Sequence, residues 1–145
     1  MREVATPGAT TVEQVSRLLR VTPRQLVKTL IFEVGGAPVA VLVRGDHDVN
    51  MAKLTRVLGG SAVQLASAET IRRVTRAPVG FAGPVGLTGV NIIVDTAVAG
   101  LTGVVTGANR ADAHLVNVSI PRDVRVDQIG DVRYVTEEDD CPSCR

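Results

Sequence analysis

The side chain best placed for chemistry is a lysine within an apolar stretch. The chain carries 16 basic residues in 145, but only two of them, Lys28 and Lys53, are lysines. Apolar residues flank Lys28 on both sides, including Val27 and Leu30. An ammonium group on such a wall is partly desolvated and can bind a phosphate or hydroxyl, or assist proton transfer. A lysine that snorkels from an apolar surface to water fits the same spacing.

Three further features could contribute to a site. The Gly80–Pro84 loop could bring backbone N–H and C=O groups close to a ligand, although a plain surface connection has the same composition. Asp95 follows an apolar run and could orient an amine or a water, but carboxylates also commonly end strands. His114 follows Gly107-Ala108-Asn109 and could line a cavity, or it could be an ordinary half-buried histidine. Taken one at a time, each feature favours its structural interpretation.

The sequence lacks the motifs that are typical of several reaction types. There is no G-x-S-x-G elbow, no G-x-x-x-x-G-K-[ST] phosphate loop and no H-E-x-x-H zinc helix. Cys141 and Cys144 offer two zinc ligands where a structural site needs four. We therefore expect neither a metal nor another cofactor.

Composition excludes some partners and leaves others open. Aromatic residues make up 2% of the chain, too few for a platform on which RNA bases stack, and the net charge of +1 is low for an independent nucleic-acid binder. No run of 18 apolar residues predicts a membrane span, and the N-terminal residues lack the apolar core of a signal peptide. The two cysteines do not suggest a disulfide framework, and we expect a cytoplasmic location without membrane contact.

The elements that must position these residues are mixed. Helices are expected at 12–19, briefly after Thr22-Pro23, after Asn50 to 58, and after Ser67 to 75, each with a capping residue. Apolar runs at 29–34 and 39–43 around Gly35-Gly36 predict a hairpin, and further strands are expected at 63–66, 91–95, 103–106 and 115–120. The fold class predicted is α+β: a curled, mostly antiparallel (mixed), barrel-like sheet flanked by short helices. Residues 1–135 form one domain, followed by an acidic Cys-x-x-Cys tail at 136–145.

Considered together, the residues match a known pattern over most of the chain. The matching segments are Thr6-Pro7-Gly8, Val27-Lys28-Thr29-Leu30, 41–47 with Asn50, 77–87, Asp95, Gly107-Ala108-Asn109, His114 and Asn117. In order and spacing they resemble the editing (insertion) domain of bacterial prolyl-tRNA synthetase, in the YbaK-like aminoacyl-tRNA deacylase family. The tail, Asp140-Cys141-Pro142-x-Cys144, resembles the junction at which that insertion rejoins the synthetase core, which favours an excised fragment over a free-standing protein.

The resemblance implies post-transfer editing: hydrolysis of mischarged alanyl-tRNA(Pro), with water as the nucleophile and without a cofactor. Lys28 would then be the central catalytic side chain, and the acceptor end of tRNA(Pro) carrying alanine would be the partner, with the rest of the synthetase if the chain is a fragment. The resemblance also implies substrate-binding roles for a set of residues around the aminoacyl group and the terminal adenosine. These are Thr6, Val12, Val15, Leu30, Gly80, Phe81, Ala82, Gly83, Pro84, Asp95, Asn109 and His114.

Within this set, Val12 and Val15 would form the apolar wall that admits a methyl group and excludes proline, and Thr6 would lie near the terminal adenosine. Two alternatives remain at this point. One is a free-standing deacylase acting in trans with another specificity, such as cysteinyl-tRNA(Pro). The other is a non-catalytic insertion that only positions tRNA.

Overall fold

The β2–β3 hairpin forms the centre of the larger of two sheets. The computed structural model describes residues 1–77 and 80–134. Strands β2 (Val27–Val34) and β3 (Ala37–Arg44) pair antiparallel over their full length, and Val41, Leu42 and Val43 are completely buried. Burial of three consecutive residues means that both faces of the hairpin are covered, as the unbroken apolar run predicts.

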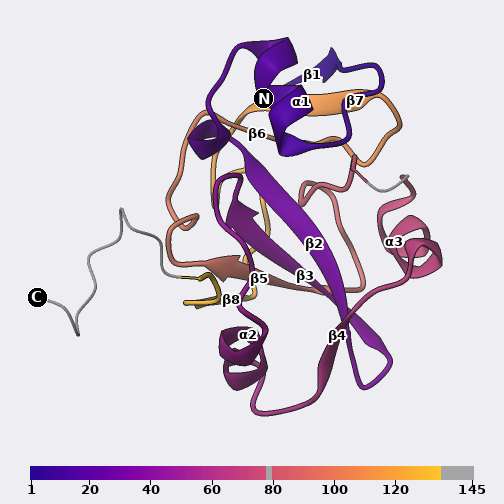
Figure 1. Cartoon of the computed structure of the whole chain (residues 1–145), viewed down its shortest axis with the longest axis vertical. Helices are drawn as coiled ribbons and strands as arrows, with labels where there is room; N and C mark the ends of the chain where they lie inside the picture. Colours follow the sequence, from indigo (N-terminus) through magenta and orange to yellow (C-terminus); the bar gives the residue numbers. More distant parts are fainter. Residues whose placement is uncertain (78–79, 135–145) are drawn as a thin grey trace, which may run out of the picture.

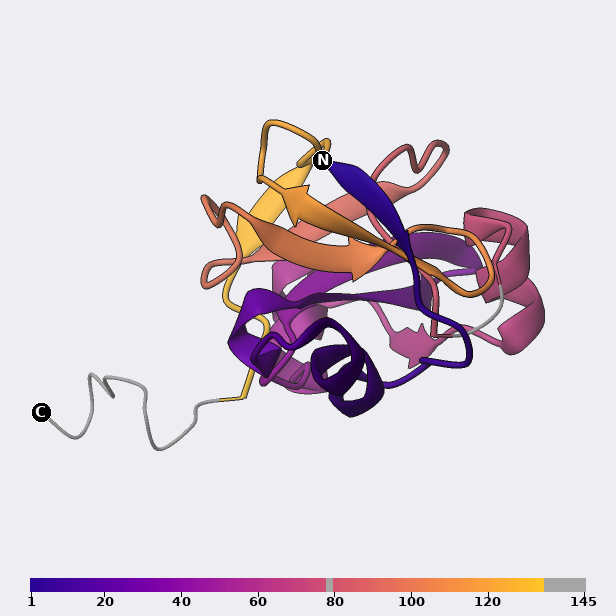
Figure 2. The ribbon, with the colours of Figure 1, turned by 90° about the horizontal axis from the view of Figure 1, so that it is seen from above.

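Three more strands extend this sheet. Strand β4 (Val63–Leu65) pairs antiparallel with β2, whereas β5 (Asn91–Asp95) and β8 (Gln128–Gly130) are added in parallel beyond β3, giving the order β4-β2-β3-β5-β8. The second sheet has the order β1-β7-β6, with β1 (Arg2–Ala5), β6 (Val104–Gly107) and β7 (Ala113–Val118) all antiparallel. It lies above the end of the hairpin at which β2 begins (Figures 1 and 2).

Short helices flank the sheets. Helix α1 (Val12–Leu19) begins with a capping box between Thr11 and Gln14, and α2 (Met51–Val57) and α3 (Ala68–Thr75) are capped by the side chains of Asn50 and Ser67. A single 3₁₀ turn, η1 (Pro23–Gln25), precedes β2. In Figure 1, α1 lies beside the smaller sheet and α2 at the opposite end of the molecule.

The α+β class, the hairpin and the mostly antiparallel pairing are confirmed. Two strands, β1 and β8, were not predicted, because both are short, largely exposed and lack a run of buried apolar residues. The strands also form two sheets that do not close into a barrel within the described residues; one isolated bridge, Leu26 to Val105, joins them. The tail at 136–145 lies outside the described residues.

Candidate functional site

A cavity of about 320 Å³ opens where the start of β2 meets α1 and the smaller sheet. Its wall is mostly apolar, with a few polar side chains. The described residues that line it are Thr10, Thr11, Val12, Val15, Leu26, Val27, Lys28, Thr29, Leu30, Ile31, Leu65, Ile71, Gly80, Ala82, Val105, Thr106, Gly107 and His114. This volume lies at the lower end of the range for small-molecule sites, about 300–1,000 Å³.

Lys28 lines this cavity and reaches toward solvent. Its side chain is 22% exposed, and Nζ lies 3.3 Å from Oδ1 of Asp48, a carboxylate that is itself 86% exposed. Because Asp48 is so open to water, the ion pair is weak and leaves the ammonium available to a ligand. Among the described cavity residues, Lys28 is the one that carries a permanent positive charge.

His114 enters the cavity from the second sheet, at the start of β7. The side chain is buried, and a hydrogen bond of 2.6 Å joins its Nδ1 to Oγ1 of Thr6. The ring of Phe81 packs against the imidazole at a centroid distance of 5.6 Å. Burial lowers the pKa of His114, because the charged form loses solvation. At neutral pH the cavity therefore presents a neutral, fixed imidazole.

The loop after α3 contributes backbone groups rather than large side chains to the cavity wall. Gly80 and Ala82 line the cavity, and Gly80 has φ +100° and packs so closely on Thr10 that an added Cβ would lie 2.6 Å from the threonine Cβ. Gly83 and Gly107 approach each other just as closely, since a Cβ on Gly83 would lie 1.7 Å from the Gly107 carbonyl oxygen. Only glycine allows the loop this close to β6.

Asn109 forms hydrogen bonds with the same loop. Its Oδ1 accepts a hydrogen bond from Gly83 N (2.7 Å), and its Nδ2 donates to Gly83 O (2.8 Å). Asn109 N donates to Phe81 O (2.9 Å). The predicted residues Phe81, Gly83 and Asn109 thus lie behind the cavity wall, where they support it, and so does buried Pro84.

Helix α1 forms an apolar wall. Val15 is 2% exposed and packs with Leu26 and Val105, and Val12 lies beside this cluster. Both valines line the cavity, as does Leu30 of β2. The capping box at Thr11 fixes the first turn of the helix, so the valines are held rigidly against the opening.

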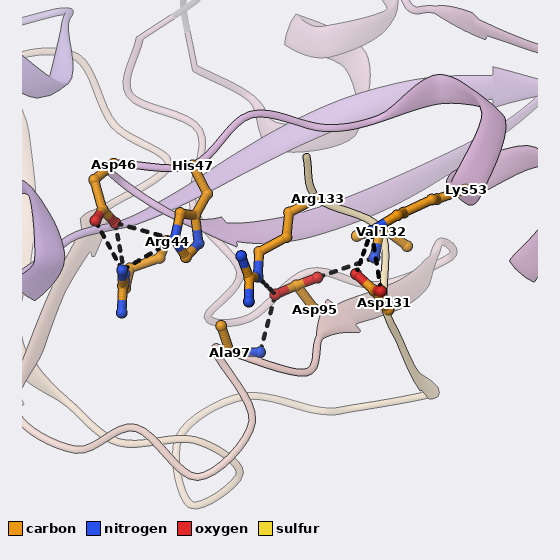
Figure 3. Close-up of polar contacts among 9 residues, drawn as sticks. All are labelled: Arg44, Asp46, His47, Lys53, Asp95, Ala97, Asp131, Val132 and Arg133. Carbon is orange, nitrogen blue, oxygen red and sulfur yellow. Dashed lines mark hydrogen bonds and ion pairs between the residues drawn. The ribbon is translucent and has the colours of Figure 1, made fainter. Parts of the chain in front are cut away.

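Asp95 does not line this cavity, although the resemblance implies a substrate-binding role for it. Its carboxylate is completely buried at the end of β5, where it accepts hydrogen bonds from Val132 N (3.0 Å) and Ala97 N (2.9 Å) and pairs with Arg133 (Figure 3). A carboxylate at a strand end satisfies local donors, and here those donors come from the turn after β5 and from the segment after β8. Asp95 is a structural anchor.

Sequence reasoning missed part of the wall. Thr106 and Val105 of β6 line the cavity although nothing in their local pattern marks them. Thr29 was noted only as part of a matching segment, yet it also lines the cavity. The available signal for Thr29 was a polar residue on the apolar face of a core strand, between Val27 and Ile31. Within the described residues there is no group of three or more His, Cys, Asp or Glu that could hold a metal ion.

Residues 6–120 match the family model for the aminoacyl-tRNA editing domain, and the chain belongs to this family. Its relatives are proline–tRNA ligases: those of Nitratidesulfovibrio vulgaris (strain DP4) and Geobacter sulfurreducens are each 49% identical over 99% of this chain. The match covers 25% of each ligase, so the chain spans about a quarter of the length of these relatives.

Solved structures show the same fold. A hypothetical protein is 29% identical with a TM-score of 0.78, over 92% of this chain and 91% of that one. A structure described as a candidate trans-editing enzyme for prolyl tRNA synthetase is 22% identical with a TM-score of 0.78, over 92% and 87% of the two chains. In the described part of this chain, no helix is long and apolar enough to cross a membrane.

Proposed function

We propose that this chain hydrolyses the ester bond of mischarged alanyl-tRNA(Pro), acting as the editing site of a longer proline–tRNA ligase. The observation that carries the proposal is the small apolar cavity that brings together Lys28, His114 and the glycine loop. Family membership supports an editing role, and the relatives' names support tRNA(Pro) as the substrate class.

The reaction requires little from the protein beyond correct positioning of the ester and a water molecule. An aminoacyl ester is activated, so water adds to its carbonyl carbon, the bond to the ribose oxygen breaks, and alanine and a free ribose hydroxyl are released. Placement of the ester beside water can supply a large part of the acceleration in such a step. The neighbouring ribose hydroxyl can help to activate the water, and no covalent protein nucleophile is required.

We assign Lys28 the role of stabilising the negative charge that develops on the substrate in the transition state. Negative charge builds on the carbonyl oxygen as water adds, and a cation or N–H donor fixed nearby lowers the barrier. The Lys28 ammonium lies on the cavity wall and is held loosely by exposed Asp48. Neutral His114 and the backbone of Gly80 and Ala82 line the same cavity, and we assign them to hold the aminoacyl group there.

Size selection is assigned to the wall of α1. Val15, Leu26 and Val105 are each at most 4% exposed and pack in one cluster, so the wall cannot move aside without loss of packing. A rigid apolar wall excludes a larger side chain by overlap. Exclusion of a larger group is easier than rejection of a smaller one, for which one methylene gives only about 10–200-fold.

The test compares the two lysines. Lys28 and Lys53 side chains are both 22% exposed, and each pairs with an exposed aspartate, at 3.3 Å and 3.0 Å. We expect Lys28→Ala to lower the rate of alanine release from alanyl-tRNA(Pro) by about 100-fold or more, the loss typical of one stabilising donor. Lys53→Ala, the matched control, should keep the wild-type rate.

Three results would contradict the proposal. The first is the absence of deacylation by the wild-type chain, which would favour a non-catalytic insertion. The second is an equal rate for wild type and Lys28→Ala, which would remove Lys28 from its assigned role. The third is faster release of cysteine from cysteinyl-tRNA(Pro) in a parallel assay, which would change the substrate.

A further inference from the structure

Hydrogen-bond alternation determines which backbone groups of β2 face its outer edge. Gly45 N donates to Leu26 O (2.8 Å), so these two residues form a hydrogen-bonded pair with β3. Such pairs alternate along an antiparallel ladder, so the N–H and C=O of Thr29 and Ile31 point away from β3. The bond from Ala66 N to Ile31 O (3.0 Å), on the outer side, agrees with this alternation.

The outer edge of β2 is covered at both ends but not in the middle. Strand β4 pairs with β2 only at Phe32–Val34, and the bridge between Leu26 and Val105 covers the other end. In the described part of the chain no strand pairs with Thr29 on this edge. The cavity occupies this gap, and the five consecutive residues 27–31 all line it. The backbone donor and acceptor of Thr29 therefore face the cavity.

The Thr29 side chain adds a third polar group at the same point. The residue is 8% exposed, and its hydroxyl has no hydrogen-bond partner among the described residues. Thr106, also on the wall, differs because its hydroxyl donates to Gly107 O (3.1 Å). A buried hydroxyl without a partner costs free energy, and a change of the χ1 rotamer can turn the oxygen toward a ligand.

The substrate carries one charged group for which the described cavity wall offers no carboxylate. An aminoacyl ester carries an α-ammonium group, yet no described Asp or Glu lines the cavity, and Asp95 is committed to Arg133 and two backbone donors elsewhere. The carbonyl of Gly107 already accepts from Thr106. We propose that the carbonyl and hydroxyl oxygens of Thr29 accept hydrogen bonds from the α-ammonium group of the bound aminoacyl ester. This inference rests on the proposed deacylase function.

The test removes the hydroxyl while keeping the shape, with Thr29→Val, and assays two substrates. Alanyl-tRNA(Pro) carries the ammonium, whereas lactyl-tRNA(Pro), made from it by deamination, carries a hydroxyl in its place. We expect Thr29→Val to slow alanine release about tenfold or more, the value of one charge-assisted hydrogen bond, and lactate release much less. Thr29→Ser, which keeps the hydroxyl, should recover most of the alanine rate.

Thr70→Val is the matched control. Thr70 is 7% exposed, and its hydroxyl donates to Glu33 Oε1 (2.7 Å) outside the cavity. We expect Thr70→Val to melt at a lower temperature than wild type with an unchanged rate per folded molecule, whereas Thr29→Val should melt no lower than wild type because no hydrogen bond is lost. This contrast separates a loss of binding from a loss of folding.

The outcomes separate the two claims. If the wild-type chain releases neither alanine nor lactate, the proposed deacylase function fails. If wild type is active and Thr29→Val retains its full rate, the hydroxyl plays no part and the inference is overturned. Equal losses on alanyl and lactyl substrates would also overturn it, because the hydroxyl would then contact a group that both substrates share.

Discussion

At the scale of single residues, buried His114 makes the stability of the folded chain depend on pH. Its pKa is lowered from 6.5 by burial, so below about pH 6.5 the unfolded chain binds a proton that the folded chain resists. The free energy of unfolding should therefore fall as the pH drops from 7 toward 5, and His114→Gln should flatten this dependence. Urea unfolding followed at pH 7, 6 and 5 measures the effect.

Two carboxylates with lowered pKa values, Asp123 and Asp46, titrate below this pH range. The pKa of Asp123 is lowered to about 2 by its hydrogen bond from Arg122, and that of Asp46 lies below 3.8, where desolvation is outweighed by Arg44 and His47. Stability contributed by these groups is present above about pH 4 and is lost only as the pH falls through their lowered pKa values. An identical pH dependence for wild type and His114→Gln between pH 7 and 5 would contradict the prediction.

Residue types alone could predict part of the site. Lys28 and His114 were chosen because few residue types do this chemistry, and both line the cavity. The local pattern at Asp95 was correct about the strand end but gave no information on which donors would meet the carboxylate. The proposed polar role of Thr29 depends on how far strand β4 extends along β2. A short segment of sequence does not contain this information, because the two strands are far apart in the chain.

At the scale of elements, the contact between the glycine loop and β6 is the most sensitive to change. In Gly83→Ala the new Cβ would lie 1.7 Å from Gly107 O, so the loop must move away from β6. We expect Gly83→Ala to lower the unfolding free energy by more than about 2 kcal/mol and to reduce deacylation, as overpacking typically costs about 1–3 kcal/mol. Urea unfolding and the alanine-release assay report both effects.

Gly86→Ala is the control in the same loop. Gly86 has φ +79° but open space around its Cβ position, so only backbone strain of about 1–2 kcal/mol is expected, with the cavity wall left in place. A smaller loss of stability in Gly83→Ala than in Gly86→Ala would show that the loop adapts to the extra methyl group.

Local patterns predicted most elements correctly because capping residues and apolar periodicity act within a few residues. Helices α1, α2 and α3 begin after Thr11, Asn50 and Ser67, as their sequences indicate. Strands β1 and β8 have no such internal signal: each exists because a partner strand far along the chain offers a free edge. Their positions depend on the rest of the fold.

At the scale of the whole molecule, Asp95 joins the end of the described chain to strand β5 of the larger sheet. Its carboxylate accepts a hydrogen bond from Val132 N and pairs with Arg133 (Figure 3). Arg133 in turn forms an isolated antiparallel bridge with Val49. Asp95→Ala should lower the unfolding free energy by about 3–5 kcal/mol, because a mostly buried guanidinium loses its carboxylate. Urea unfolding measures this loss.

Asp131→Ala provides the comparison for this prediction. Asp131 is 59% exposed and pairs with Lys53 only two positions before Arg133, and the loss of such a surface pair should cost less than about 1 kcal/mol. Equal losses in the two variants would mean that burial of the Asp95 pair contributes nothing beyond an ordinary surface contact.

The hydrogen bond between Thr6 and His114 joins residues 108 positions apart, which has a consequence for biosynthesis. A ribosome releases α1 and Lys28 well before β6 and His114, which lie much further along the chain. Until then the apolar faces of Val15 and Leu26 have no opposite wall. Contacts this distant in sequence also slow folding. The nascent chain therefore exposes an apolar half-site until β6 has been made, and chaperone binding in that interval should concentrate on α1 and the first strand of the hairpin.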